Sequence, residues 1–284
     1  MFRDKSSPRS DYPSSNSCTR SAEPRPRVCR FLLTFDDGPD TGPSLTSSVV
    51  LAQLSTNRTQ RHIKAIFFVQ TRNTGGGGTE YGRFLLRREH NEGHVIGLHS
   101  GTARGHVSHV RMGTQELLQS LQDGMEDIRK LTGHRPSFVR PPYWLFTSST
   151  LAQYESQGLN MLLSDMKAYD GVNWGMHVFR RPNMRSELVK VLRRYQRQEL
   201  PLVDGCTPIV VTFHDTNAYT ANHLEEYLNI LLEEADRLRL PLSHKPFYDS
   251  SSEITAAALR RAIHPVQQDP YGSDCRDERG VFGV

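Results

Sequence analysis

The chain has 284 residues, 36% of them hydrophobic and 23% charged, with a formal net charge of +4, a composition that fits one large globular domain or two small ones. Residues 1–30 hold seven basic and three acidic side chains, so the remaining 254 residues carry 28 of each and are neutral. A neutral body argues against a nucleic-acid-binding protein, and the lack of any apolar run of about 18 residues excludes a transmembrane span.

The N-terminal segment, residues 1–27, is dominated by Ser, Pro and Arg. We predict a disordered tail, because its apolar surface is too small to offset the loss of chain entropy on folding. The segment lacks the apolar stretch of a secretory signal. The cytoplasm is therefore the default location, with export left open if further sequence precedes Met1.

The four cysteines are Cys18, Cys29, Cys206 and Cys275. None form a Cys-x-x-Cys pair, which predicts free thiols rather than a zinc ribbon or a disulfide framework. The sequence does not indicate an oligomeric state.

From about residue 28, short apolar runs alternate with longer amphipathic ones. The apolar runs are mostly continuous, which is typical of strands covered on both faces. Strands are predicted at residues 28–35, 63–69, 94–98, 137–140, 160–164 and 208–213, with a weaker one at 240–243.

Helices are predicted between these strands, at residues 44–54, 80–92, 115–131, 148–157, 185–198, 222–239 and 253–263. Thr114 is the predicted N-cap of the third helix, and Gly93 and Gly158 follow helix ends, where a left-handed residue is favoured. Residues 71–79, with four consecutive glycines, are predicted to form a flexible loop. This loop lacks the Lys-Ser/Thr pair of a phosphate-binding loop.

The alternation of strands and helices predicts an α/β fold. Parallel strands would be joined by right-handed helical crossovers, in either a barrel or a doubly wound sheet. We find no internal repeat.

Charged or ionisable side chains follow five of the predicted strands. They are Asp36 with Asp37, His99, Arg140, Asp165, and His214 with Asp215. In α/β barrels the carboxyl ends of the strands carry the active site, so these residues are predicted to converge on one rim.

One carboxylate and two imidazoles from this set would suit a catalytic divalent metal ion. Asp36 or Asp37 can supply the oxygen and His99 one nitrogen. The second nitrogen can come from His106 or His109, which follow in the next loop.

Five features match one family in chain order: Thr-Phe-Asp-Asp-Gly-Pro at 34–39, His99 with a downstream histidine, Arg-Pro-Pro-Tyr at 140–143, Asp170 with Trp174, and His214. They resemble the motifs of the polysaccharide deacetylase family (NodB homology, carbohydrate esterase family 4). The resemblance spans about residues 30–249 and implies a distorted (β/α) barrel of about seven strands. The predicted organisation is a tail at 1–27, a NodB-homology domain at 28–249, and a short helix with a polar tail at 250–284.

The resemblance implies a role for each residue of the first motifs. Asp36 would be the general base and Asp37 a metal ligand beside His99. Arg140 would hold Asp36 ionised, and the backbone N–H of Tyr143 would face the developing oxyanion.

The later motifs would supply the general acid and the substrate pocket. His214 would protonate the leaving nitrogen, with Asp170 orienting it and Asp165, nearer its strand, as a second candidate for that role. Trp174 would form a wall of the acyl pocket.

The chain departs from the family pattern in two places. The second metal histidine of the family follows the first by four residues, but that position is Ala103. We favour His106 over His109 as its replacement on spacing. The residue two before the catalytic acid is normally Leu and here is Thr212, which predicts a larger or more polar acyl pocket.

The loop at 171–184, with Arg180 and Arg181, is predicted to shape substrate access or to carry a solvated charge pair.

The predicted function is metal-dependent hydrolysis of the N-acetyl group of an N-acetylglucosamine-type glycan or oligosaccharide. Zinc is the default ion, and cobalt, nickel or iron would also suit two histidines and an aspartate. One alternative is an amidase of the same fold acting on a small N-acylated molecule. Another is a carbohydrate-binding protein that kept the fold without activity.

Overall fold

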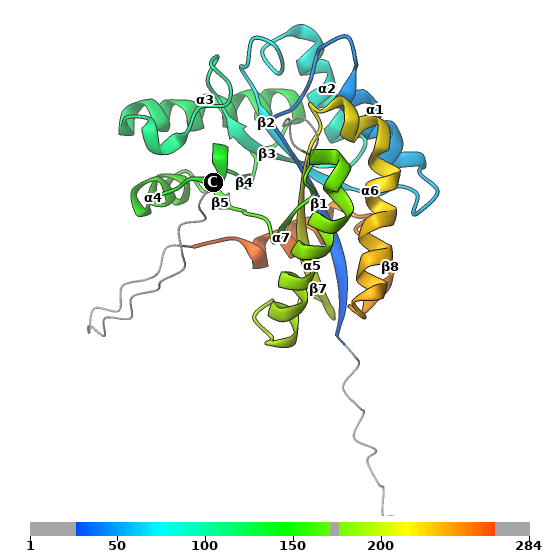
Figure 1. Ribbon diagram of the computed structural model, residues 1–284. Coiled ribbons are helices and arrows are strands. Elements are labelled where there is room, and N and C mark those ends of the chain that lie inside the picture. The colour runs from blue at the N-terminus through cyan, green and yellow to red at the C-terminus, as the bar shows by residue number, and fades with distance from the viewer. Residues whose placement is uncertain (1–26, 171–175, 265–284) are drawn as a thin grey trace, which may run out of the picture.

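The computed structural model describes residues 27–170 and 176–264 (Figure 1). The predicted tail at 1–27 therefore lies outside the described residues except for Arg27, as do Cys18, Trp174 and Cys275. None of the helices in the described ranges is long and apolar enough to cross a membrane.

The strands form one parallel sheet in the order β5-β4-β3-β2-β1-β7-β6, and β8 also pairs with β1. This path is a curled half-barrel, so the predicted barrel fold is confirmed. The strands are β1 (Val28–Asp36), β2 (Ala65–Gln70), β3 (Val95–Ser100), β4 (Phe138–Val139), β5 (Asn160–Met161), β6 (Met166–Lys167), β7 (Cys206–His214) and β8 (Leu242–Phe247).

Seven α-helices and three short 3-10 helices connect the strands within the described ranges. The α-helices are α1 (Thr46–Thr56), α2 (Glu80–Asn91), α3 (Thr114–Thr132), α4 (Ser148–Ser156), α5 (Arg180–Gln196), α6 (Ala218–Arg237) and α7 (Ser251–Arg261). The 3-10 helices are η1 (His109–Arg111), η2 (Pro142–Trp144) and η3 (Met176–Phe179). Helices α1 and α6 pack against each other beside the sheet (Figure 1).

Several element predictions were wrong in detail. Helix α5, for example, begins at Arg180 rather than at residue 185. Strand β6 was missed, because two residues are too short to show a pattern. Helix α3 has Gly113 at its N-cap and Thr114 as its first residue, with no side-chain cap bond. Helix α6 begins four residues early, because the Asn217 side chain accepts from the backbone N–H groups of Tyr219 and Thr220.

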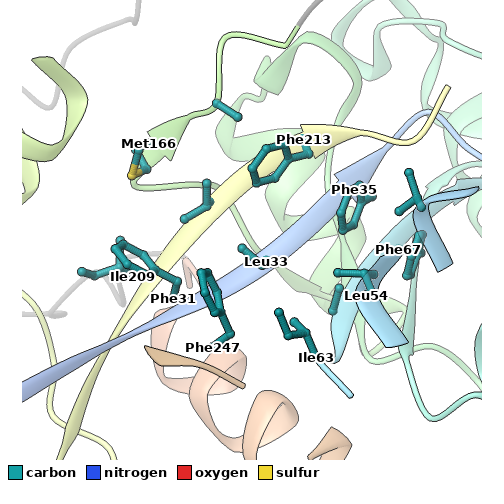
Figure 2. Close-up of a cluster of buried hydrophobic side chains, with 14 of the residues drawn as sticks. Phe31, Leu33, Phe35, Leu54, Ile63, Phe67, Met166, Ile209, Phe213 and Phe247 are labelled. Carbon is teal, nitrogen blue, oxygen red and sulfur yellow. The ribbon is translucent and has the colours of Figure 1, made fainter. Parts of the chain in front are cut away.

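Alternation along the central strand separates two faces of the sheet. Odd-numbered β1 residues such as Phe31 and Phe35 lie in the larger core cluster with the surrounding helices, where Phe35 stacks on Phe67 at 5.0 Å (Figure 2). Even-numbered residues face the concave side. There Leu32 belongs to a second cluster with Ile254, Ala257 and Ala258 of α7, the helix predicted to follow the domain.

The concave face rises in layers from α7 to the carboxyl ends of the strands. Strands β1 and β7 pair in register, so Thr34 lies opposite Thr212 and Asp36 opposite His214. The ionisable side chains therefore meet above a layer of threonines, which itself lies above apolar core.

The glycine-rich loop is a compact turn with internal hydrogen bonds rather than an open loop. The N–H groups of Gly76 and Gly78 both donate to the Asn73 carbonyl. A Cβ at Gly77 would collide with the Gln70 carbonyl, so this position requires glycine.

Candidate active site

Asp36 and Arg140 form a buried ion pair at the end of β1. Arg140 Nη1 donates to Asp36 Oδ1 at 2.8 Å, and both side chains are almost completely inaccessible to solvent. Arg140 Nε donates to the Leu162 carbonyl at 2.9 Å, and its guanidinium lies 4.3 Å above the Phe68 ring. Burial lowers the pKa of Arg140 and the charge of Asp36 opposes that shift, so the structure places the two residues together as an ion pair.

Asp37 lies beside two histidines on the same rim. Its Oδ1 is 3.2 Å from His99 Nε2 and 3.6 Å from His106 Nε2. The donor atoms of these three residues all lie within 4.8 Å of one another. Asp37 has φ 75°, a left-handed conformation that is uncommon for a residue other than glycine.

The hydrogen bond of His99 fixes how its ring faces Asp37. His99 Nδ1 is 2.7 Å from the Arg140 carbonyl, which can only accept, so Nδ1 carries the proton. In the neutral ring the buried Nε2 therefore presents a lone pair to the Asp37 carboxylate, and it has no hydrogen-bond partner among the described residues. Two electron pairs facing each other at 3.2 Å fit a shared cation, and a divalent metal ion suits the donor set.

Electrostatics support the ionised form of Asp37. Burial alone would raise the pKa of Asp37, but a proton shared with His99 and positive charge on His106 and His214 would outweigh burial and lower it. Burial likewise lowers the pKa of His106, which keeps that ring neutral and able to bind a metal.

His109 lies outside this donor set. Its ring is buried in η1, and Nδ1 is hydrogen bonded to Tyr154 Oη at 2.8 Å. Burial lowers its pKa to about 3. The geometry thus places His106, the residue favoured on spacing, next to Asp37.

His214 is held by Asp170 across from Asp36. Asp170 Oδ1 is 3.0 Å from His214 Nδ1, and Oδ2 accepts from the His214 backbone N–H at 2.7 Å and from Thr220 Oγ1 at 2.9 Å. Burial alone would lower the pKa of His214, but Asp170, with Asp36 and Asp37, raises it to about 10. The imidazole is therefore protonated at neutral pH.

The alternative prediction, that Asp165 orients His214, is wrong. Asp165 precedes β6 and lies far from the rim, where its carboxylate pairs with Arg194 at 2.7 Å and with Arg261. Its Oδ2 accepts from the Val210 backbone N–H. Asp165 therefore holds helices against β7 rather than orienting His214.

Tyr143 and Trp144 form a strained turn above Asp36. Both have positive φ, 60° and 59°, which is uncommon for aromatic residues and costs about 1–3 kcal/mol each. The Tyr143 ring stacks on His106 with centroids 4.3 Å apart. Trp144 Nε1 lies 3.4 Å from Asp36 Oδ2, so the indole contacts the second carboxylate oxygen.

Thr212 is buried beneath the rim instead of lining an open pocket. Its hydroxyl is 3.0 Å from Arg140 Nη1 and 3.2 Å from Thr34 Oγ1. Trp174 lies outside the described residues. Arg180 and Arg181, predicted either to shape substrate access or to form a solvated charge pair, begin α5 and pair with Glu226, Glu233 and Glu234 of α6.

Sequence reasoning missed Gln70 and Trp144. Gln70 Nε2 donates to Asp37 Oδ1 at 3.1 Å, and Asn73 holds the Gln70 side chain. Gln70 directly follows the strand predicted at 63–69, but the strand-end rule considered only charged or ionisable side chains, and glutamine is neither. Glycine is also required at position 38, because a Cβ there would collide with the buried Asp215 carboxylate.

These observations define a class of protein: a parallel (β/α) half-barrel with an Arg-paired aspartate, an Asp-His-His cluster and an Asp-held histidine on one rim. Residues 25–162 match the family model described as polysaccharide deacetylase. The resemblance inferred from the motifs is thereby confirmed, and these residues match a polysaccharide deacetylase domain over nearly half of the chain.

Curated relatives match part of the chain. The peptidoglycan-N-acetylglucosamine deacetylase PgdA of Listeria monocytogenes is 34% identical over 114 residues, 40% of this chain and 21% of that protein. The peptidoglycan-N-acetylmuramic acid deacetylase PdaC of Bacillus subtilis is 33% identical over 123 residues, 43% of this chain and 23% of that protein. The alignments thus span less than a quarter of these relatives.

Solved structures share the fold. A chitin deacetylase from Colletotrichum lindemuthianum superposes with a TM-score of 0.57 at 18% identity, covering 78% of this chain and 92% of that one. A family 4 acetyl xylan esterase from Clostridium thermocellum, in complex with a cobalt ion, superposes with a TM-score of 0.53 at 20% identity, covering 79% and 89%.

Proposed function

We propose that this protein is a metal-dependent deacetylase that hydrolyses the N-acetyl amide of an N-acetylglucosamine-type glycan or oligosaccharide. The observation that carries the proposal is the lone pair of His99 Nε2 facing the Asp37 carboxylate beside His106, on the rim that also holds Asp36 and His214. The family match and the names of the relatives support the substrate class.

Asp37, His99 and His106 are the residues that would hold the metal. A bound divalent ion would supply Lewis-acid polarisation of the amide carbonyl and lower the pKa of water. Zinc is the ion we propose first, and the donor set also suits cobalt, nickel or iron.

Asp36 is the general base of this proposal. Its Oδ1 accepts a hydrogen bond from Arg140, which fixes the rotation of the carboxylate, and its Oδ2 faces the rim near Trp144. A carboxylate placed in this way can take the proton of the attacking water as the C–O bond forms.

The Tyr143 N–H and His214 act on the other atoms of the amide. Pro141 and Pro142 have no N–H, so the Tyr143 N–H is the first donor of this turn that can meet a developing oxyanion. His214 is protonated, and Asp170 occupies its Nδ1. Nε2 is therefore the atom that donates a proton to the leaving nitrogen as the C–N bond breaks.

Acetate release from N-acetylglucosamine oligomers tests the proposal. Activity should disappear with chelator and return with a divalent metal. Asp36→Asn should lower kcat by about 10³-fold or more, a loss typical of a general base with its water. Release from small N-acyl amides but not from the oligomers would favour the amidase alternative. No hydrolysis by the metal-loaded protein would favour a binding protein.

A further inference from the structure

The layer directly beneath the rim contains two hydroxyl groups that the proposed reaction does not use. Thr34 and Thr212 lie opposite each other on β1 and β7, two residues before Asp36 and His214. Both side chains are buried, and their oxygens are 3.2 Å apart. Between them and the rim lies the guanidinium of Arg140.

The direction of these hydroxyl hydrogen bonds follows from the Val211 carbonyl. Thr34 Oγ1 lies 3.0 Å from that carbonyl, which can only accept, so the Thr34 proton is committed there. Thr34 Oγ1 must then accept from the Thr212 hydroxyl. Both hydroxyl oxygens consequently have lone pairs left for a donor above them.

Arg140 Nη1 is that donor, and its two N–H groups are shared among three acceptors. It lies 2.6 Å from Thr34 Oγ1, 3.0 Å from Thr212 Oγ1 and 2.8 Å from Asp36 Oδ1. Nη2 has no hydrogen-bond partner among the described residues, so Nη1 and Nε make the hydrogen bonds that seat the guanidinium. A cation buried this completely requires such acceptors, because burial penalises its charge.

We propose that Thr212 is a positioning residue that, with Thr34, seats Arg140 and thereby fixes the rotation of the Asp36 carboxylate. This inference rests on the proposed function, in which Asp36 is the base. It replaces the expectation that Thr212 shapes the acyl pocket. The Thr212 side chain lies one layer below His214, is 1% exposed and directs its oxygen at Arg140.

Thr212→Val and Thr212→Ser test this role. Valine keeps the shape but replaces the acceptor with a methyl group against Nη1, whereas serine keeps the oxygen. We expect Thr212→Val to lower kcat for N-acetylglucosamine oligomers about tenfold with little change in KM. Thr212→Ser should restore kcat to within about twofold of the wild-type value.

Thr207→Val is the matched control, because Thr207 is also buried on β7 but lies at the opposite end of the strand. It should leave kcat unchanged. Thermal unfolding of each variant shows whether any loss of rate reflects unfolding.

Two results would overturn the inference. One is a Thr212→Val enzyme with wild-type kcat. The other is a changed preference between N-acetyl and N-propionyl substrates, which would return Thr212 to the acyl pocket.

Crystal structures of the Val and Ser variants provide a measurement that does not depend on activity. Arg140 Nη1 should move away from Asp36 Oδ1 in the Val variant and stay in place in the Ser variant. An unmoved guanidinium in Thr212→Val would contradict the inference. If the metal-loaded wild type releases no acetate, the proposed function fails while these structures still decide the role of Thr212.

Discussion

Asp170 holds His214 at two points, with Oδ1 at 3.0 Å from the ring Nδ1 and Oδ2 at 2.7 Å from the backbone nitrogen. One carboxylate therefore fixes both the position of the strand end and the rotation of the ring. Thr220 of α6 donates to the same Oδ2, which ties the carboxylate to the next helix. Asp170 therefore has two effects on His214: its charge keeps the ring protonated, and its hydrogen bond fixes the orientation of the ring.

Asp170→Asn should separate these two effects. The pKa of His214 is raised to about 10 mainly by Asp170, and without that charge burial would lower it. A general acid acts only while protonated, so activity is lost as pH rises through its pKa. The alkaline limb of kcat/KM against pH should therefore move to lower pH, with activity at neutral pH falling about 10²–10³-fold. An unmoved alkaline limb would show that another group is the acid.

Asp165→Asn should lower the stability of the protein and leave the pH profile of its activity unchanged. Asp165 is buried against Arg194 and Arg261, so loss of its charge should lower the free energy of unfolding by about 2–4 kcal/mol. The alkaline limb should stay where it is, because Asp165 does not contact His214. Chemical denaturation checks the first expectation and a pH profile the second. A shifted limb with unchanged stability would reverse the assignment of the two aspartates.

The rim residues could be predicted because parallel strands deliver their last residues to the same edge. Asp36, His99, Arg140 and His214 each follow an apolar run, and the structure brings them together. Asp165 follows an apolar run too, but the chain turns after β5 and crosses to β7, which places the residue away from the rim. Sequence patterns do not encode such a turn, because it depends on how the half-barrel closes.

Contacts within the concave layers could not be predicted. The family pattern predicts Thr212, two residues before His214, to lie in the acyl pocket, whereas its hydroxyl contact with Arg140 depends on the register of β1 and β7. Trp144 contacts Asp36 because Tyr143 and Trp144 both adopt positive φ. Aromatic residues rarely adopt this conformation, so the sequence does not predict it. Strand β6 is two residues long and carries no periodicity.

The metal affinity of two variants should show whether His106 or His109 is the metal ligand. His106 Nε2 is 3.6 Å from Asp37 Oδ1, whereas His109 Nδ1 is occupied by Tyr154. His106→Ala should weaken metal binding by more than the roughly 10–100-fold that loss of a supporting residue costs. His109→Asn should stay within about tenfold of wild type. Competition with a chromophoric chelator measures both constants, and the reverse ranking would make His109 the ligand.

The buried carboxyl group of Glu89 should make the stability of the protein depend on pH in an unusual way. This residue of α2 is fully buried, and neither carboxylate oxygen has a hydrogen-bond partner in the described part of the chain. Burial, with the charges of Asp215 and Glu92, raises its pKa well above the usual value for Glu, so the folded protein keeps the proton. The unfolded chain releases that proton above about pH 4.3.

Since the folded state then binds more protons than the unfolded state, the Glu89 contribution to stability falls as pH rises, by up to about 1.4 kcal/mol per pH unit. Glu89→Gln removes this dependence while keeping the size of the side chain. The free energy of unfolding of the variant, minus that of the wild type, should therefore increase between pH 4 and pH 7. Urea denaturation at several pH values measures that difference, and Asp215 contributes equally to both proteins. Parallel stability curves would mean that Glu89 is already ionised in the folded protein, with a cation or water in contact with its carboxylate.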